Sequence, residues 1–144
     1  MAVTASLYGL AMQSALNGEI DFDTDTIKVM LCGSSYTPLQ DTHRYKSSVT
    51  GEVTGTGYTA GGLPLSSKTV TYASGSNTLT LDAADVTWPA SSITARYAVI
   101  YKDTGTAATS PLICFVDFGE EITSAGAAFL ISWDAAGIVA LTAA

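Results

Sequence analysis

The chain has 144 residues, of which 47% are hydrophobic and only 13% charged, a composition typical of one folded domain and not of a disordered protein. Its 13 acidic and 6 basic residues disfavour nucleic acid as a partner, because binding to phosphate needs a basic surface. No apolar run approaches the ~20 residues of a membrane helix, and no basic segment precedes the apolar N-terminal residues. We therefore expect no membrane partner and no export.

A short N-terminal helix, from about residue 5 to residue 16, is the only strong helix signal. Thr4 can cap its start and Gly18 supplies a stop. Apolar residues recur between them at helical spacing: Leu7, Tyr8, Ala11, Met12 and Ala15. This stripe predicts a face that is covered either by the core of the same domain or by a partner.

An acidic turn follows the helix. Its spacing, Asp21-x-Asp23-x-Asp25, is that of the start of a calcium loop, but Thr26 stands where the loop needs Gly and Cys32 where it needs Glu. We therefore predict a turn without a metal. The alternation in the next segment, 27–32, predicts a strand with apolar residues on both faces, as in the centre of a sheet.

The segment from about residue 38 to residue 62 is predicted to be a long irregular excursion. Five glycines interrupt it, and Asp41 can cap only a turn or two. Long loops in compact domains are often functional, so we expect an intersubunit contact here. Arg44 and Lys46 flank Tyr45, which places two of the six basic residues beside an aromatic ring and predicts attachment to an acidic patch on a partner.

The remainder of the chain predicts short strands. Residues 67–81 form a hairpin with one buried face, a strand at 86–88 stops at Pro89, and long antiparallel strands occupy 93–101 and 112–118. A final hairpin pairs 129–133 with 138–141. The expected fold is therefore all-β: a single domain formed by an antiparallel β-sandwich or barrel, with one short N-terminal helix.

Residue patterns for catalysis are weak. The single histidine, His43, has no nucleophile motif near it, Glu120 and Glu121 have no identifiable acid–base partner, and the glycines of 55–62 lack a phosphate-loop ending. Cys32 and Cys114 are predicted to be buried free thiols. We expect neither an enzyme nor a cofactor or metal.

Aromatic residues divide into two groups. Those on alternating strand positions are expected in the core: Tyr72, Trp88, Tyr97, Tyr101 and Trp133. Tyr36, Tyr45 and Tyr58 fall in predicted loops and are candidates for an exposed contact surface. The full set of candidate protein-contact residues is Arg44, Tyr45, Lys46, Tyr36, Tyr58, Leu7, Tyr8 and Met12.

Three segments together resemble a family of small virion proteins of tailed bacteriophages. They are AVTASLYGLAMQSALNGEIDFDTDTIKVMLC, SYTPLQDTHRYKSSVTGEVTGTGYTAGG and ITARYAVIYKDTGTAATSPLICFVDFG. The resemblance extends over nearly the whole chain, but these segments contain no catalytic motif.

The resemblance implies a capsid decoration or cement protein, related to head fibres, on the capsid surface of a virion. Its partners would be the major capsid protein or other virion subunits, and the chain would form a homo-oligomer on the particle. A tail or fibre module that recognises a host sugar or protein is the alternative. A third possibility is a small hydrolase that uses carboxylates. It predicts a pocket that brings together two of Asp82, Asp85, Asp117, Glu120 and Glu121.

Overall fold

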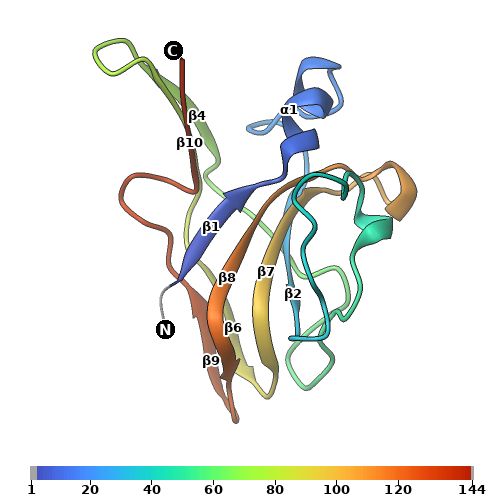
Figure 1. Cartoon of the computed structure of the whole chain (residues 1–144). Coiled ribbons are helices and arrows are strands. Elements are labelled where there is room, and N and C mark those ends of the chain that lie inside the picture. Colours follow the sequence, from blue (N-terminus) through green and yellow to red (C-terminus); the bar gives the residue numbers. More distant parts are fainter. Residues whose placement is uncertain (1–2, 144) are drawn as a thin grey trace.

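The computed structural model describes residues 3–143, which form an all-β fold with one short helix and antiparallel sheets. Figure 1 shows the arrangement. The elements are β1 (Thr4–Leu7), α1 (Gly9–Leu16), β2 (Ile27–Cys32), the 3-10 turn η1 (Lys46–Ser48), β3 (Leu63–Pro64), β4 (Thr69–Ala73), β5 (Thr78–Asp82), β6 (Val86–Ser91), β7 (Thr94–Lys102), the 3-10 turn η2 (Ala107–Thr109), β8 (Leu112–Thr123), β9 (Ala127–Ile131) and β10 (Val139–Thr142).

The main sheet has five strands in the order β1-β8-β7-β2-β3. Its middle strands are apolar on both faces, as expected for β2, and each face supports its own core. Along β2, Val29 and Leu31 point into one core, while Met30 and Cys32 point into the other. The sheet is therefore the central layer of the molecule, and both of its faces are covered.

The two cores differ in what covers them. On one face, the paired strands β6 and β9 supply Trp88 and Phe129, whose rings meet edge to face at 6.1 Å. On the other face lie tyrosines from β7, together with Tyr8 and Tyr36. The irregular segment 38–62 wraps around the β2 edge, because Val49 packs on the second core and Val53 on the first.

A second sheet of three strands, β10-β5-β4, projects beside the body (Figure 1). We refer to it as the ribbon. The β4–β5 hairpin is confirmed, with Tyr72 opposite Leu79 and Val70 opposite Leu81. Its predicted buried face is wrong in part: every residue of β4 is exposed, and Val70 and Tyr72 keep 40% and 57% of their surface.

The N-terminal helix is shorter than predicted. Residues 4–7 form β1 and pair with Asp117 to Cys114 of β8, so the helix begins only at Gly9. The apolar spacing was misleading because it combines residues of β1 with residues of α1. The chain turns between the two elements at Tyr8, whose side chain is buried. The predicted stop is correct, since Gly18 adopts a φ of +76°, which favours glycine.

The final hairpin was also predicted wrongly. Strand β9 pairs with β6, and β10 pairs with β5, so the two strands belong to different sheets. The connecting loop is fixed by Asp85, whose carboxylate accepts hydrogen bonds from the Trp133 backbone and the Ser132 hydroxyl. Strand β6 continues past Pro89, which lies at an irregularity in the β6–β9 register where a missing N–H is tolerated.

Candidate binding groove between helix α1 and the ribbon

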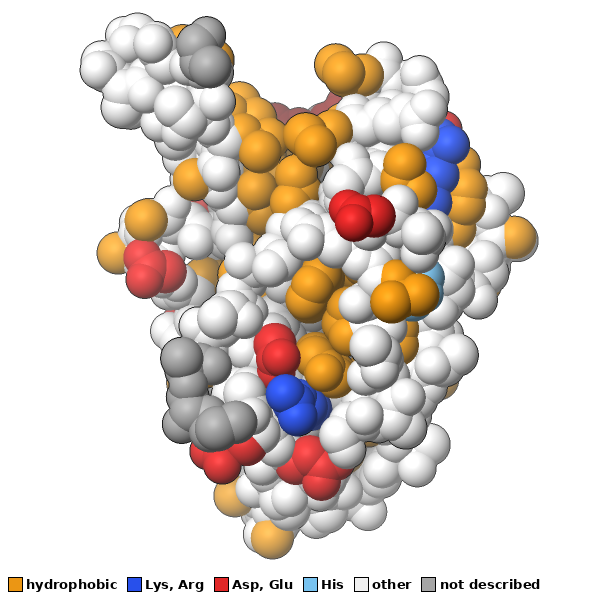
Figure 2. All heavy atoms as spheres, in the orientation of Figure 1, with side chains coloured by type: hydrophobic (Ala, Val, Ile, Leu, Met, Phe, Trp, Pro, Cys, Tyr) orange, Lys and Arg blue, Asp and Glu red, His pale blue; other side chains and the backbone are white. Residues whose placement is uncertain are grey.

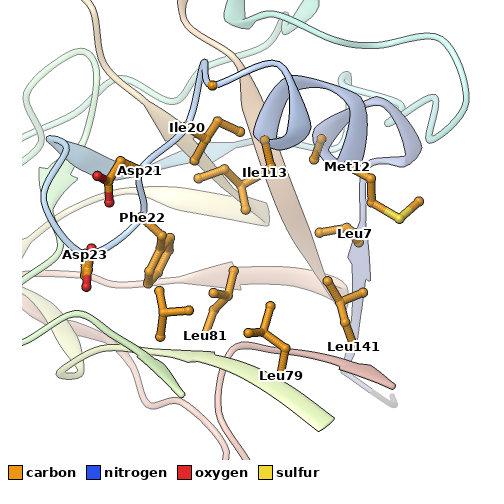
Figure 3. Close-up of a pocket in the computed structure, with 14 residues that line it drawn as sticks. Leu7, Met12, Ile20, Asp21, Phe22, Asp23, Leu79, Leu81, Ile113 and Leu141 are labelled. Atoms are coloured by element: carbon orange, nitrogen blue, oxygen red, sulfur yellow. The ribbon is translucent and has the colours of Figure 1, made fainter. Parts of the chain in front are cut away.

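An apolar groove lies between α1 and the ribbon. It encloses about 570 Å³. Figure 2 shows hydrophobic side chains gathered in this hollow, and Figure 3 shows how they point into it from both sides. Its lining consists of Leu7, Ala11, Met12, Ala15, Gly18, Ile20, Asp21, Phe22, Asp23, Val70, Leu79, Leu81, Ile113 and Leu141.

One wall is held in place by a chain of hydrogen bonds beneath α1. The Tyr8 N–H donates to the Ile113 carbonyl at 3.0 Å, which fixes the turn between β1 and α1. The Tyr8 hydroxyl lies 2.8 Å from that of Tyr36, which in turn lies 3.0 Å from Nδ1 of His43. Burial raises the pKa of Tyr8 well above its ordinary value, so this phenol stays neutral. Helix α1 is thereby anchored, with Met12 turned outward.

The opposite wall is one face of the ribbon. Because side chains alternate along a strand, cross-strand neighbours share a face. Val70, Leu81 and Val139 form one row, and Tyr72, Leu79 and Leu141 form the next. The other face of the ribbon is mainly threonine: Thr69, Thr71, Thr78, Thr80 and Thr142. The ribbon is therefore strongly two-sided, and its apolar side faces the groove.

Carboxylates occur at one end of the groove. Asp21 and Asp23 flank Phe22, whose ring enters the groove and is 5% exposed (Figure 3). The Asp21 N–H donates to the Asp25 carboxylate at 2.7 Å, which tightens the turn. A hydrogen bond from the Thr24 side chain lowers the pKa of Asp21, so this carboxyl is ionised at neutral pH. The groove is apolar along its walls and negative at this end.

Three of the candidate contact residues meet here. Leu7 and Met12 line the groove, and Met12 keeps 49% of its surface exposed. Tyr8 is fully buried below them and is not available for contact. The ribbon residues of the groove were missed as contact residues. Their alternation was visible in the sequence, but it was interpreted as a core face.

The other candidates are held against the domain. Arg44 forms an ion pair with Glu19 at 2.7 Å, and the Tyr45 hydroxyl donates to the same carboxylate at 3.1 Å. The Lys46 ammonium lies 5.0 Å from the centre of the Tyr101 ring. These side chains fasten the irregular segment to the body and remain partly exposed, so their role as a contact surface stays a prediction.

The loop tyrosines follow the same pattern. Tyr36 is 1% exposed, which overturns its assignment to an exposed surface. The Tyr58 ring stacks on Trp88 at 5.9 Å, and its hydroxyl donates to the Glu52 carboxylate at 2.8 Å. Burial raises the pKa of Tyr58 as well. Tyr36 is therefore not available for contact, whereas Tyr58 is only partly buried and stays a candidate.

All six Lys and Arg side chains contact other groups of the same chain. Four of them form ion pairs with carboxylates: Lys28 with Asp103, Arg44 with Glu19, Arg96 with Asp117, and Lys102 with Asp25. Lys46 lies over Tyr101, and Lys68 donates to the Asp25 carbonyl at 2.6 Å. Since 4 of the 13 carboxylates are paired in this way, 9 have no ion-pair partner among residues 3–143.

Within the described residues, no group of three His, Cys, Asp or Glu side chains is arranged to hold a metal ion. Cys32 and Cys114 are buried free thiols, as predicted. No helix in residues 3–143 is long and apolar enough to cross a membrane. Comparison of the chain with protein-family models, curated proteins and solved structures gives no match.

Proposed function

We propose that this chain is a non-catalytic structural protein of a tailed-phage particle, which binds the outside of the capsid and stabilises it. The observation that carries the proposal is the apolar groove. Soluble domains seldom leave a continuous apolar hollow open to water unless something binds there. The walls of this groove are mainly aliphatic and include Leu7 and Leu141. Its polar side chains, Asp21 and Asp23, lie at one end.

The resemblance of three long segments to small virion proteins supports the choice of partner: the major capsid protein or another virion subunit. The chemistry needed is only binding. A protein that binds the assembled shell more tightly than the dissociated subunits stabilises the shell by mass action. Many copies, joined as homo-oligomers on the particle, would together add a large effect from individually weak contacts.

Copy number and position test this proposal. In purified particles of the phage that encodes the chain, we expect a copy number comparable with that of the major shell subunit, and density on the outer shell by electron microscopy. Shells stripped of the protein should disassemble at a lower temperature and recover on its addition. A few copies located at the tail would instead favour the host-recognition module, and absence from particles would reject a virion role.

A further inference from the structure

The apolar surface of the groove extends beyond its enclosed part. On the ribbon it continues from Val70 to Tyr72, which is 57% exposed, and on α1 it continues from Met12 to Leu16, which is 90% exposed. A small ligand held in the enclosed part would leave these flanking side chains uncovered. A polypeptide segment is long enough to contact all of them.

The charges around the groove restrict what that segment can be. Asp21 and Asp23 have no ion-pair partner among residues 3–143, and Lys102, whose charge helps to lower the pKa of Asp21, is itself paired with Asp25. A ligand that carries a cation at this end would gain a favourable interaction, and one that carries an anion would be repelled.

Within residues 3–143, a second copy of the chain offers no Lys or Arg side chain that is unengaged. Every Lys and Arg already contacts a group of its own fold, and the formal net charge is −7. Two copies with this net charge also repel each other. The charge complementarity of the groove therefore favours a different chain.

We propose that the groove binds an apolar polypeptide segment of another protein, with Lys or Arg at the end of the segment that lies beside Asp21 and Asp23. Met12 and the apolar face of the ribbon contact its hydrophobic side chains. That the segment belongs to a shell subunit rests on the function proposed above, whereas its chemistry rests on the groove itself.

The test uses a synthetic peptide, Ala-Val-Ala-Leu-Ala-Val-Ala-Lys-Lys, and a matched peptide in which Glu replaces both Lys residues. Titration followed by NMR gives the affinity and the residues contacted. We expect the Lys peptide to shift the signals of Met12, Val70 and Leu79, and to bind about tenfold more tightly than the Glu peptide at low salt. The ratio should shrink as salt is added.

Two pairs of variants locate the site. Val70→Asp places a charge on the apolar face of the ribbon and should abolish binding, whereas Thr71→Asp, on the opposite face of the same strand, should leave it unchanged. Asp23→Asn should reduce the preference for Lys over Glu severalfold. Glu120→Gln removes one exposed carboxylate outside the groove and should not. Circular dichroism confirms that each variant is folded.

Equal affinity for the two peptides, or binding of neither, would overturn the proposal. Binding of laurate in place of the peptides would assign the groove to a small apolar ligand, and self-association that Val70→Asp abolishes would assign it to a second copy; either result overturns the proposal. Occupancy on virus particles distinguishes failure of this proposal from failure of the proposed virion role. Normal occupancy by Val70→Asp rejects the groove as the contact but keeps the virion role, whereas particles without wild-type protein reject that role.

Discussion

The five-stranded sheet and the ribbon differ in how completely their apolar faces are covered. A sheet must cover its apolar faces, and the main sheet covers both with parts of its own chain, so that Ile100 and Tyr101 at its centre are fully buried. The ribbon covers its apolar face only near the body and leaves Val70 and Tyr72 exposed. Two-sided burial thus defines the part of the molecule that is complete by itself, and one-sided burial defines the part that is available to a partner.

The largest effect is expected where the main sheet is buried. Ile100→Ala should lower the free energy of unfolding by about 2–5 kcal/mol, because it leaves a cavity among side chains that cannot collapse into it. Val70→Ala on the ribbon should cost about 0.5–1 kcal/mol. Urea unfolding measures both. Similar losses for the two variants would contradict the distinction between a complete sheet and an incomplete one.

The second prediction concerns the irregular segment that covers the tyrosine-rich face. Arg44→Glu combined with Lys46→Glu removes an ion pair that is only 25–30% exposed and sets a new carboxylate beside Glu19. We expect a loss of about 1–3 kcal/mol in the free energy of unfolding. Glu120→Lys, at an exposed carboxylate without an ion-pair partner in residues 3–143, is the control. A double variant as stable as the wild type would show that these contacts do not hold the segment in place.

A smaller effect should appear with pH. Two donors converge on Nδ1 of His43, the Tyr36 hydroxyl at 3.0 Å and the Leu39 N–H at 3.4 Å, so this nitrogen accepts and the ring is neutral. Burial lowers the pKa of His43 below that of the unfolded chain. Since the unfolded chain then binds the proton first, stability is complete above about pH 6.5 and falls as the pH drops below it.

Unfolding of the wild type and of His43→Gln in urea, between about pH 7.5 and pH 5.5, measures this contribution. The wild type should lose stability over the interval, and the variant should show a flatter profile. Carboxylates that titrate at lower pH are common to both proteins and cancel in the comparison. Parallel profiles would show that protonation of His43 does not act on the tyrosine-rich face.

The last prediction is that thiol reagents have no effect on the folded protein. Burial raises the pKa of Cys32 and of Cys114 to about 12, and the two thiols lie in different cores. Folded protein should therefore react with neither a disulfide reagent nor iodoacetamide, both thiols should react in urea, and a reductant should leave the free energy of unfolding unchanged. Rapid labelling of the folded chain would show that one of the cores opens.

Local pattern predicted much of the main sheet. Apolar residues on both faces of β2 and β8 indicated that these strands lie at the centre of a sheet, because a strand covered on both sides has no polar face. Pairing over long distances was less accessible. Nothing in residues 127–142 separates β9 from β10 as members of different sheets, and nothing local in Ala5 or Ser6 shows that β8 recruits them as a strand.

The site was predicted only in part, for a related reason. Met12 was identified because an amphipathic stripe is a local signal, and Leu7 was included in that stripe although it belongs to β1. An alternating strand shows which side chains share a face but not whether that face is covered, so Leu79 and Leu81 were assigned to the core. The internal contacts of Arg44 and Lys46 were not predicted, because their partners, Glu19 and Tyr101, lie far away in the sequence.

The position of β1 also has a kinetic consequence. Thr4 to Leu7 are synthesised well before their strand partners, residues 114–117, and before Leu141, which closes the far side of the groove. The groove is thus assembled from segments that lie far apart in the sequence, and long-range pairings of this kind form slowly. A partner that binds there would select finished molecules over nascent or misfolded ones, so that assembly itself would act as a check on synthesis.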